Sequence, residues 1–547
     1  MKTSLLTFMS TLLLLLGAAI NASAYSAGET FEVSMGLEGL TTGSSSSKPA
    51  YYKFKVNEDG NTCTLVSAQF QNSGVLPTQY RENINIVIPA TAEGLTVTAI
   101  GSSVFSSCSN VKSITIPETV KEIGNNSFKE CRDLVTLNLG GVERIGTGCF
   151  YYPGADFQKA LKSVDLSNVK YIGNNSFVNF PNLTSVELSP ELESLGTGCF
   201  QGCPKVELEF PEDSRYAVID NIVYECNGTG ADKQPVSLLM LQPNFNGSDI
   251  TLPATVTSIA TRAFEGNTNL RTINLGNVQT VGNYTFMNCK NLTTVMGSEN
   301  IVNLGSSAFS GCTSLNSFSI GTGCTADAAS IAKALEGCTG LQSFVVEEGN
   351  PNCRAEDGVL FNKEGTTLVS YMCDNKAEYS VPAGVTTIAD GAFNNVGSTL
   401  TDLTIGNDVT TVGEGKDLFL RNGASSLEHL TLGSKVESIG NMAFYNCANI
   451  RTVACDAVTP PAIPSKWVFS YDTCNNAELI VPEEATDAYM NAKGWKEAFG
   501  NRVTTGVKNV MVEDTEGGAY YNLHGIRVDN PRSGHLYIHN GKKLIYR

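Results

Sequence analysis

One short pattern recurs along this chain and constrains its fold more than any other feature. An Ile-Gly pair, or a close variant, is followed five residues later by phenylalanine and often three residues after that by cysteine. Steps of 22 or 23 residues recur, as from Ile100 to Ile123. We count about twelve copies; the copy at Ile331 is degenerate, and alanine (Ala260 or Ala389) replaces the glycine in two others. The anchors are Ile100, Ile123, Ile145, Ile172, Leu195, Ile259, Val281, Leu304, Ile331, Ile388, Val412 and Ile439.

Most copies end in leucines or other aliphatic residues with the spacing L-x-x-L-x-L, for example Leu134, Leu137 and Leu139. A fixed period of about 20–29 residues with this spacing is the signature of leucine-rich repeats. One copy holds too few apolar residues for its own core, so successive coils must stack and bury them against one another. The pattern predicts a repeat solenoid: a right-handed coil with a parallel β-sheet on one face, short strands or helical turns on the other, and β-rich caps.

Two corner sequences, GNNSF and GTGCF, each occur twice at the same place in the period. We expect the glycine after isoleucine to permit a tight bend. We expect the serine or asparagine before phenylalanine to cap a short helical turn. Because the corners share their position in the repeat, a copied structural unit is a better interpretation than a duplicated active-site loop.

The assembled consensus, V-x-x-I-G-x-x-A/S-F-x-x-C-x-x-L-x-x-L-x-I/L, resembles the BspA-like leucine-rich repeat of bacterial surface proteins. The resemblance covers roughly residues 96–505. It implies a surface or secreted protein, and several members of that family are linked to adhesion to molecules of a host or partner cell.

The first residues have the features of an export signal. Lys2 supplies a positive start, residues 5–20 are largely apolar, and Ala-Ser-Ala ends at Ala24. We predict a signal peptide at 1–24, cleaved after Ala24, and a secreted or outer-surface protein. A membrane anchor is the alternative, but the run is short for the ~30 Å hydrocarbon core. No later segment is apolar enough to span a membrane.

The rest of the chain divides around the repeats. Short strand patterns before the first anchor predict a cap that covers the open edge of the first coil. Two stretches around Asp220 and Asp357 interrupt the period and predict β-hairpin extensions. The predicted segments are an N-terminal β-cap at 25–95, repeats at 96–505, hairpin insertions near 214–245 and 350–380, and a closing unit at 457–505.

The tail, residues 506–547, has a different pattern. Alternating apolar residues predict a small antiparallel sheet, and the sequence YNLHGIRV, followed by GHLYI and GKK, resembles the C-terminal sorting domains of Bacteroidota. That resemblance implies a Bacteroidota origin and passage through the outer membrane by type nine secretion. A plain C-terminal β-module is the alternative.

Charge and cysteine usage bound the function further. The net charge of −17 argues against nucleic acid and anionic membranes as partners, because phosphates attract lysine and arginine. Sixteen cysteines in an exported chain could form disulfides. Many share a repeat column, however, so we expect most to be buried, unpaired thiols.

The sequence predicts no enzyme, no cofactor and no metal site. Of the four histidines, His429 alone lies in the repeats, and no nucleophile has a recognisable histidine or acid setting. The cysteines lack C-x2-C spacing, and the corner glycines lack the lysine of a phosphate loop.

The outward positions of the predicted sheet are the remaining candidate surface. They form a band rich in hydroxyl and amide groups with some acid, and the two columns we aligned contain no aromatic residue. Simple sheet solubility explains such a band; a polar face for a protein partner is the functional alternative. The candidate binding residues are Thr115, Asn138, Asp165, Glu187, Asn274, Asp402 and His429.

We therefore expect a non-enzymatic cell-surface binding protein that adheres to an extracellular protein of a host matrix or partner cell. Glycan binding for nutrient capture is the first alternative, which an aromatic cluster at Tyr216, Tyr224 and Phe245 would favour. A structural envelope protein without a specific ligand is the second.

Overall fold

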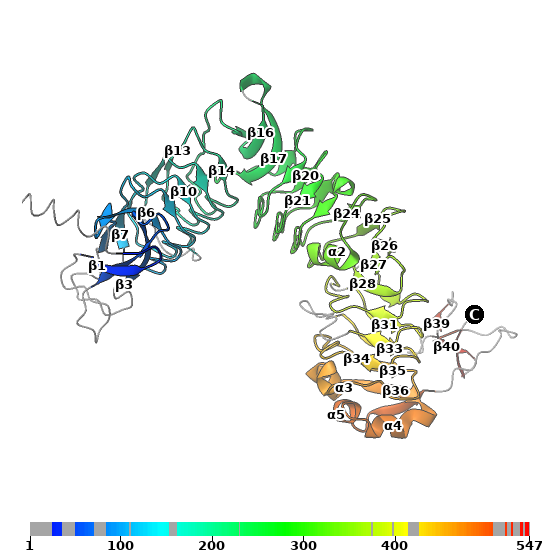
Figure 1. The fold of residues 1–547 in the computed structure, drawn as a ribbon. Helices are drawn as coiled ribbons and strands as arrows, with labels where there is room; N and C mark the ends of the chain where they lie inside the picture. Colours follow the sequence, from blue (N-terminus) through cyan, green and yellow to red (C-terminus); the bar gives the residue numbers. More distant parts are fainter. Residues whose placement is uncertain are drawn as a thin grey trace, which may run out of the picture. The chain divides into compact units, whose positions relative to one another are not determined.

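The computed structural model describes most of the chain beyond the predicted signal peptide (Figure 1). The predicted cleavage site lies outside the described residues, as does much of the tail. The described residues are 25–35, 50–69, 84–108, 111–152, 161–228, 230–372, 376–396, 399–413, 426–506, 520–521, 527–528, 536–539 and 542–545.

Each coil builds two short strands. The leucine-patterned strand β11 (Ser163–Leu166) is followed by the two-residue strand β12 (Tyr171–Ile172), which precedes the glycine corner. In the next coil, β13 (Ser185–Leu188) pairs in parallel with β11, and β14 (Ser194–Leu195) pairs in parallel with β12. Alternate residues of a strand point to opposite faces, which is why Val164 is buried between two exposed neighbours. Stacked coils with two sets of parallel strands confirm the predicted solenoid.

The chain forms two compact units, of which the first holds residues 1–248, 252–265 and 276–285. Its long sheet runs β1-β2-β3-β6-β8-β10-β12-β14, and β4-β7-β9 and β11-β13 form the sheets of leucine-patterned strands. The elements not yet given are β1 (Thr30–Ser34), β2 (Tyr51–Val56), β3 (Thr62–Gln69), β4 (Ile84–Val87), β5 (Thr91–Ala92), β6 (Leu95–Ile100), β7 (Val111–Thr115), β8 (Glu122–Ile123), β9 (Thr136–Asn138), β10 (Arg144–Ile145), β15 (Tyr216–Ile219), β16 (Ile222–Asn227), η2 (Gly230–Asp232), β17 (Gln234–Leu241), β19 (Ser258–Ile259) and β21 (Thr280–Val281).

The N-terminal strands join the solenoid edge to edge. β1, β2 and β3 are antiparallel, but β3 pairs in parallel with β6, and β4 pairs in parallel with β7. These strands therefore lie at the edge of both sheets of the first coil, where unpaired backbone groups would otherwise face solvent.

The insertion near Asp220 contains an antiparallel hairpin, β15-β16, and a third strand, β17, extends it to a three-stranded meander. Asp220 and Asn221 have φ values of 52° and 61°, which suit the tight turn joining β15 to β16. The third strand, β17, pairs antiparallel with β16 and in parallel with β19. The long sheet of the first coils ends at β14, and the meander begins a new sheet that β17 continues through β19 and β21.

The second unit holds residues 249–251, 266–275 and 286–547. A second meander, β26-β27-β28, turns at Asp357 and joins β30-β32-β34, while β29-β31-β33-β35-β36-β37 continues the leucine-patterned strands into the closing segment. Its elements are β18 (Asp249–Thr251), β20 (Thr272–Asn274), β22 (Thr294–Met296), η3 (Ser298–Asn300), β23 (Asn303–Leu304), β24 (Ser317–Ile320), α2 (Ala328–Ala334), β25 (Ser343–Val346), β26 (Cys353–Glu356), β27 (Val359–Asn362), β28 (Thr367–Tyr371), β29 (Glu378–Ser380), β30 (Thr387–Ile388), β31 (Asp402–Ile405), β32 (Thr411–Val412), β33 (His429–Leu432), β34 (Ser438–Ile439), β35 (Thr452–Cys455), η4 (Lys466–Val468), α3 (Tyr471–Asn476), β36 (Glu478–Pro482), η5 (Glu483–Ala485), α4 (Thr486–Asn491), α5 (Trp495–Phe499), β37 (Val503–Gly506), β38 (Tyr520–Tyr521), β39 (Arg527–Val528), β40 (Leu536–His539) and β41 (Lys542–Ile545).

Two elements depart from the regular coil. In the degenerate copy, helix α2 replaces the two-residue strand. Its anchor residue, Ile331, is fully buried. In the tail, the strands β39-β38-β40-β41 form an antiparallel sheet, as the alternating pattern predicts.

The phenylalanines form a ladder through the core. In the first unit, Phe128 stacks on Phe105 and on Phe150, with ring centroids 5.1 and 5.3 Å apart and planes within 4° of parallel. The stack continues through Phe177 to Phe200. Offset stacking adds to the free energy gained by burying each ring.

The corner glycine is needed for close approach and not, as we expected, for a bend. Gly146 and Gly173 have no positive φ, but a Cβ on Gly173 would lie 2.5 Å from the backbone nitrogen of Thr147 in the preceding coil. The left-handed residue is the third of the corner: φ is 56° at Asn126 and 64° at Gly148. Asparagine tolerates this conformation and glycine adopts it freely, which explains why GNNSF and GTGCF are equivalent.

The residue before phenylalanine does not cap a helical turn as predicted. Instead, the Ser127 hydroxyl lies 2.6 Å from the carbonyl of Gly101 and 2.8 Å from that of Gly124, and can donate to either. Cys199 places its thiol between the matching carbonyls of Gly173 and Gly196. The side chain thus links two coils by satisfying buried carbonyls, and a thiol can substitute for a hydroxyl there.

Candidate binding surface

The outward residues of the leucine-patterned strands form ladders across neighbouring coils; we call this surface the ladder face. In the first unit, Thr115 is in register with Asn138, and Asp165 is in register with Glu187. All four side chains are exposed.

The other predicted residues lie on the ladder face of the second unit. Asn274 is half-buried on β20, and Asp402 on β31 is in register with His429 on β33. The seven predicted residues therefore form three register pairs and one separate position.

Several of these side chains also hold local structure. The side-chain oxygens of Asn138 and Asp165 accept backbone N–H bonds from Gly140 and Ser167, each at 2.9 Å. These are Asx turns, which stabilise the strand end. His429 Nδ1 lies 2.7 Å from the hydroxyl oxygen of Thr452 on the next strand.

The pair Asp165–Glu187 is electrostatically unusual. Hydrogen bonds from the Ser167 hydroxyl and backbone N–H lower the pKa of Asp165, so this carboxylate stays ionised below its ordinary range. Like charges directly opposite on neighbouring strands destabilise a sheet. Within the described part of the chain, no basic side chain lies within 4.0 Å of either carboxylate. A cationic group from a partner would relieve the repulsion between the two.

The ladder face is less polar than the sequence columns indicate. Val87 is in register with Thr115, Met296 with Asn274, and Val345 with Ser319. These three apolar side chains are 61%, 47% and 48% exposed. Our alignment passed over these positions, although a strict strand period would have included them.

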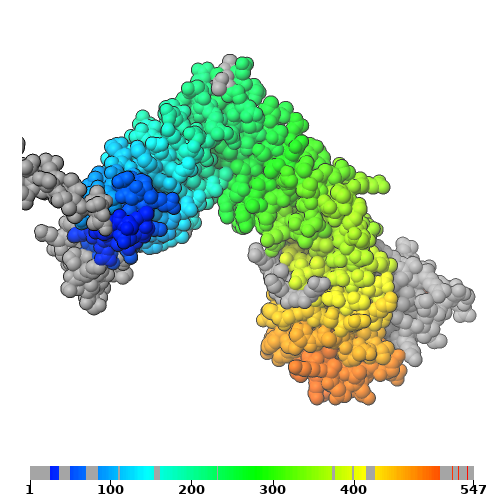
Figure 2. Space-filling model, viewed as in Figure 1, coloured from blue at the N-terminus to red at the C-terminus, as the bar shows by residue number. Residues whose placement is uncertain are grey.

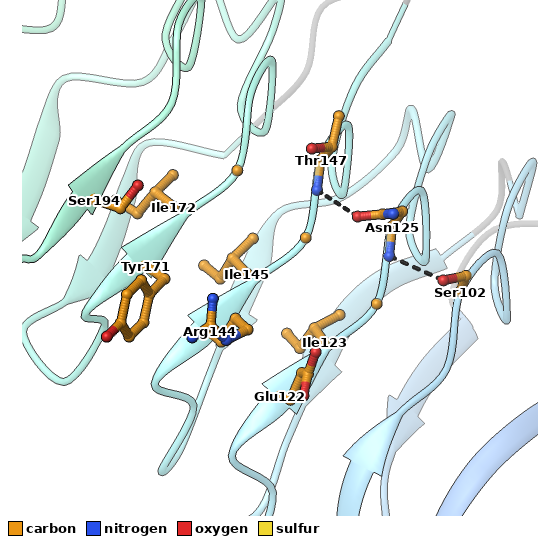
Figure 3. Close-up of a pocket in the computed structure, with 13 residues that line it drawn as sticks. Ser102, Glu122, Ile123, Asn125, Arg144, Ile145, Thr147, Tyr171, Ile172 and Ser194 are labelled. Atoms are coloured by element: carbon orange, nitrogen blue, oxygen red, sulfur yellow. Dashed lines mark hydrogen bonds between the residues drawn. The ribbon is translucent and has the colours of Figure 1, made fainter.

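The structure also has a shallow groove on the two-residue strands, which the sequence analysis did not predict (Figure 3). Its volume is about 310 Å³, and it crosses the coils of β8, β10, β12 and β14. The residue before each anchor forms one row along it: Glu122, Arg144, Tyr171 and Ser194. On the other side, the Thr147 backbone N–H donates to Asn125 Oδ1 at 2.8 Å.

Contacts within the groove occupy its polar groups. The Arg144 guanidinium lies 3.8 Å from the centroid of the Tyr171 ring, and the Tyr171 hydroxyl hydrogen-bonds to Glu193. A cation over an aromatic face is a stabilising contact in itself. The groove could have been found from the position before each Ile-Gly pair, which strand alternation places outward.

The structure gives no sign of a metal or redox centre in the residues it describes. No group of three or more His, Cys, Asp or Glu side chains is placed to hold a metal ion there. The fifteen described cysteines are buried and form no disulfide in the structure, whereas Cys373 lies outside the described residues. In the Phe-x-x-Cys column, thiols of Cys131, Cys203, Cys312 and Cys338 point to phenylalanine carbonyls one coil earlier, at 3.1–3.4 Å.

We predict that none of these fifteen thiols reacts with a water-soluble disulfide reagent in the native protein at pH 8. Burial removes access and raises the pKa of Cys353 and Cys455 to about 11, so little thiolate is present. Thiol titration in denaturant without reductant should give at least fifteen groups. A much lower count would show that the columns are oxidised to disulfides.

Comparison with known proteins decides the family. The BspA type leucine-rich repeat region matches residues 82–207, 243–354 and 369–488, which together make up more than half of the chain. The protein belongs to the BspA-type leucine-rich repeat family. Leucine-rich repeat families are generally binding scaffolds. No curated protein matches the chain.

Solved structures with the same fold come from several bacteria. A leucine-rich cell surface protein of Faecalibacterium prausnitzii is 22% identical over 71% of this BspA-type chain and 95% of its own, with a TM-score of 0.33. A leucine-rich repeat protein of Bacteroides ovatus is 18% identical over 83% and 97% of the two chains, with a TM-score of 0.31. One from Eubacterium ventriosum is 14% identical over 76% and 95%, with a TM-score of 0.36.

The cluster Tyr216, Tyr224 and Phe245 does not form an exposed platform. Tyr216 and Tyr224 are 3% and 2% exposed. The Tyr216 hydroxyl bonds the backbone of Leu195 and Glu193 at the end of the β14 strand. These tyrosines are core residues of the meander, so the exposed aromatic cluster that would favour glycan binding there is not present. Among the described residues, no helix is long and apolar enough to cross a membrane.

Proposed function

We propose that this BspA-type protein is an exported binding protein of the bacterial cell surface that adheres to a host or partner-cell protein through its ladder face. The register pair Asp165–Glu187 carries the proposal. Two exposed acidic side chains are aligned on neighbouring strands without a basic partner among the described residues. A partner that presents lysine or arginine along an extended surface would complement them.

The route to the surface is part of the same proposal. The N-terminal segment would direct export, with cleavage after Ala24, and the tail would act as a type nine sorting domain in a member of the Bacteroidota. Deleting residues 507–547 and locating the protein in cells tests this part. Unchanged surface display would remove the sorting role.

We predict that the double charge reversal Asp165→Lys and Glu187→Lys weakens partner binding at least tenfold, because it replaces attraction to a basic partner by repulsion. Binding would be measured with the chain from Tyr25 onward on immobilised matrix proteins and mucins. Wild-type affinity should fall as salt rises, since exposed charges are screened.

Glu122→Lys is the matched control, because Glu122 is an exposed acid on a strand of the other set. It should leave affinity within about twofold of wild type. Equal losses from both variants would indicate a general charge effect, and an unchanged double variant would remove the ladder face from the site. A wild-type protein that binds no protein on the panel would overturn adhesion and favour the structural role.

A further inference from the structure

Exposed aromatic residues occur at the end of the last repeat copy and the start of the closing unit. The side chains of Tyr445, Trp467 and Tyr471 are 37%, 43% and 67% exposed. We call these three the aromatic cluster. The segment that carries Trp467 and Tyr471 is drawn in orange in Figures 1 and 2.

The core beneath fixes the positions of the first two rings. Phe444 and Phe469 are buried and stack 6.0 Å apart, and they form a parallel bridge. Tyr445 follows the first of these, and Trp467 lies in η4, two residues before the second. The Tyr445 and Trp467 rings lie 6.4 Å apart at an interplanar angle of 68°. They form a corner of two nearly perpendicular rings.

The exposure of Trp467 contrasts with the other tryptophan of the chain. Trp495 is 1% exposed and donates its indole N–H to the Pro461 carbonyl at 2.8 Å. The closing region therefore buries one tryptophan with its polar group satisfied and leaves the other in solvent. Large aromatic side chains that cluster on a surface mark binding sites more often than scattered apolar residues do.

Polar groups surround the cluster in a way that suits a sugar. The Lys466 ammonium lies 4.7 Å from the centroid of the Trp467 ring. On α3, Tyr471 and Asn475 are four residues apart and so share one helix face, and Asp472, Asn475 and Asn476 are exposed. Ammonium, amide and carboxylate groups are donors and acceptors for hydroxyls. The negative aromatic face accepts the weakly positive C–H face of a pyranose ring.

We propose that the aromatic cluster is a binding subsite for the pyranose rings of a polysaccharide, separate from the ladder face. Because Lys466 lies over one face of the Trp467 ring, the sugar ring stacks on the other face; Tyr445 closes the corner beside it, and Lys466 and the α3 side chains bind hydroxyls. A protein contact is less suited, because stable protein interfaces need roughly 800 Å² per partner around such anchors. Here the exposed residues of α3 next to the cluster are mainly polar.

Tryptophan fluorescence tests the proposal directly. Because Trp495 is buried, iodide quenching of the native protein reports on Trp467. The chain from Tyr25 onward would be titrated with soluble polysaccharides and mucin-type oligosaccharides. We expect at least one glycan to bind saturably and to reduce iodide quenching at least twofold. A panel in which no glycan protects Trp467 overturns the proposal.

Variants separate this site from the ladder face. Trp467→Ala should weaken glycan binding at least tenfold, and Trp467→Phe should retain part of it, while the thermal midpoint stays unchanged because the side chain is exposed. Met296→Ala, an exposed apolar truncation on the ladder face, should bind the glycan as wild type does. Unchanged glycan binding by Trp467→Ala refutes the subsite. If Trp467→Ala instead lost protein binding and kept glycan binding, the cluster would belong to a site for a protein partner.

Discussion

Replacing Phe177 with alanine is expected to lower the free energy of unfolding by about 3–5 kcal/mol. The Phe177 ring is fully buried and stacks on Phe150 and Phe200, with centroids 5.0 and 5.6 Å apart. Its loss leaves a cavity bounded by two stiff coils and removes both stacked contacts and a tilted contact with Phe180. Because each coil contacts mainly its neighbours, the damage should concentrate around this coil.

Urea unfolding followed by circular dichroism would measure the change, and hydrogen exchange of the Gly173 and Gly196 amides would locate it. Phe210→Ala is the matched control, because Phe210 is only partly buried at the side of the same core. Phe210→Ala should lower the free energy of unfolding clearly less than Phe177→Ala does. Equal losses, or a loss below about 1 kcal/mol for Phe177→Ala, would show that the ladder does not hold the coils together.

Adding one methyl group at Gly173 is expected to cost about 1–3 kcal/mol, through overpacking. The new Cβ would lie 2.5 Å from the Thr147 nitrogen and 2.6 Å from the Gly146 carbonyl carbon, both backbone atoms that cannot move aside. The Gly173 N–H donates to the Ile145 carbonyl at 2.8 Å, so the two coils cannot separate without losing that bond.

Ala260 provides the reverse experiment in the same protein. Its N–H makes the equivalent bond to the Leu238 carbonyl at 2.8 Å, but the preceding element is the strand β17 and not another glycine corner. Ala260→Gly should therefore change the free energy of unfolding by less than about 1 kcal/mol, mainly because glycine raises the conformational entropy of the unfolded chain. Both substitutions would be compared by thermal and urea unfolding. A tolerated Gly173→Ala would mean that coil spacing adapts to side chains.

The same comparison explains a detail that sequence reasoning left open. The two copies with alanine in place of glycine, at Ala260 and Ala389, each follow a meander, and the Ala389 N–H bonds to Leu368 of β28. The signal was in the sequence, since both exceptions come directly after the interruptions. Whether alanine is tolerated at the corner depends on which backbone segment of the preceding coil lies next to it. The sequence of one repeat does not specify that segment.

The amino-acid sequence determined the period, the stacked solenoid, the inward column of Phe and Cys, and the strand alternation that turns Asp165 and Glu187 outward. These features follow from local spacing, because apolar residues that recur at a fixed interval can be buried in few folds other than a stacked coil. The tertiary structure alone decided what lies across from each side chain. It buried Tyr216 and Tyr224 in the meander, and left Trp467 exposed while Trp495 was covered. Exposure and register are properties of neighbouring coils, so residues far apart in the sequence set them together.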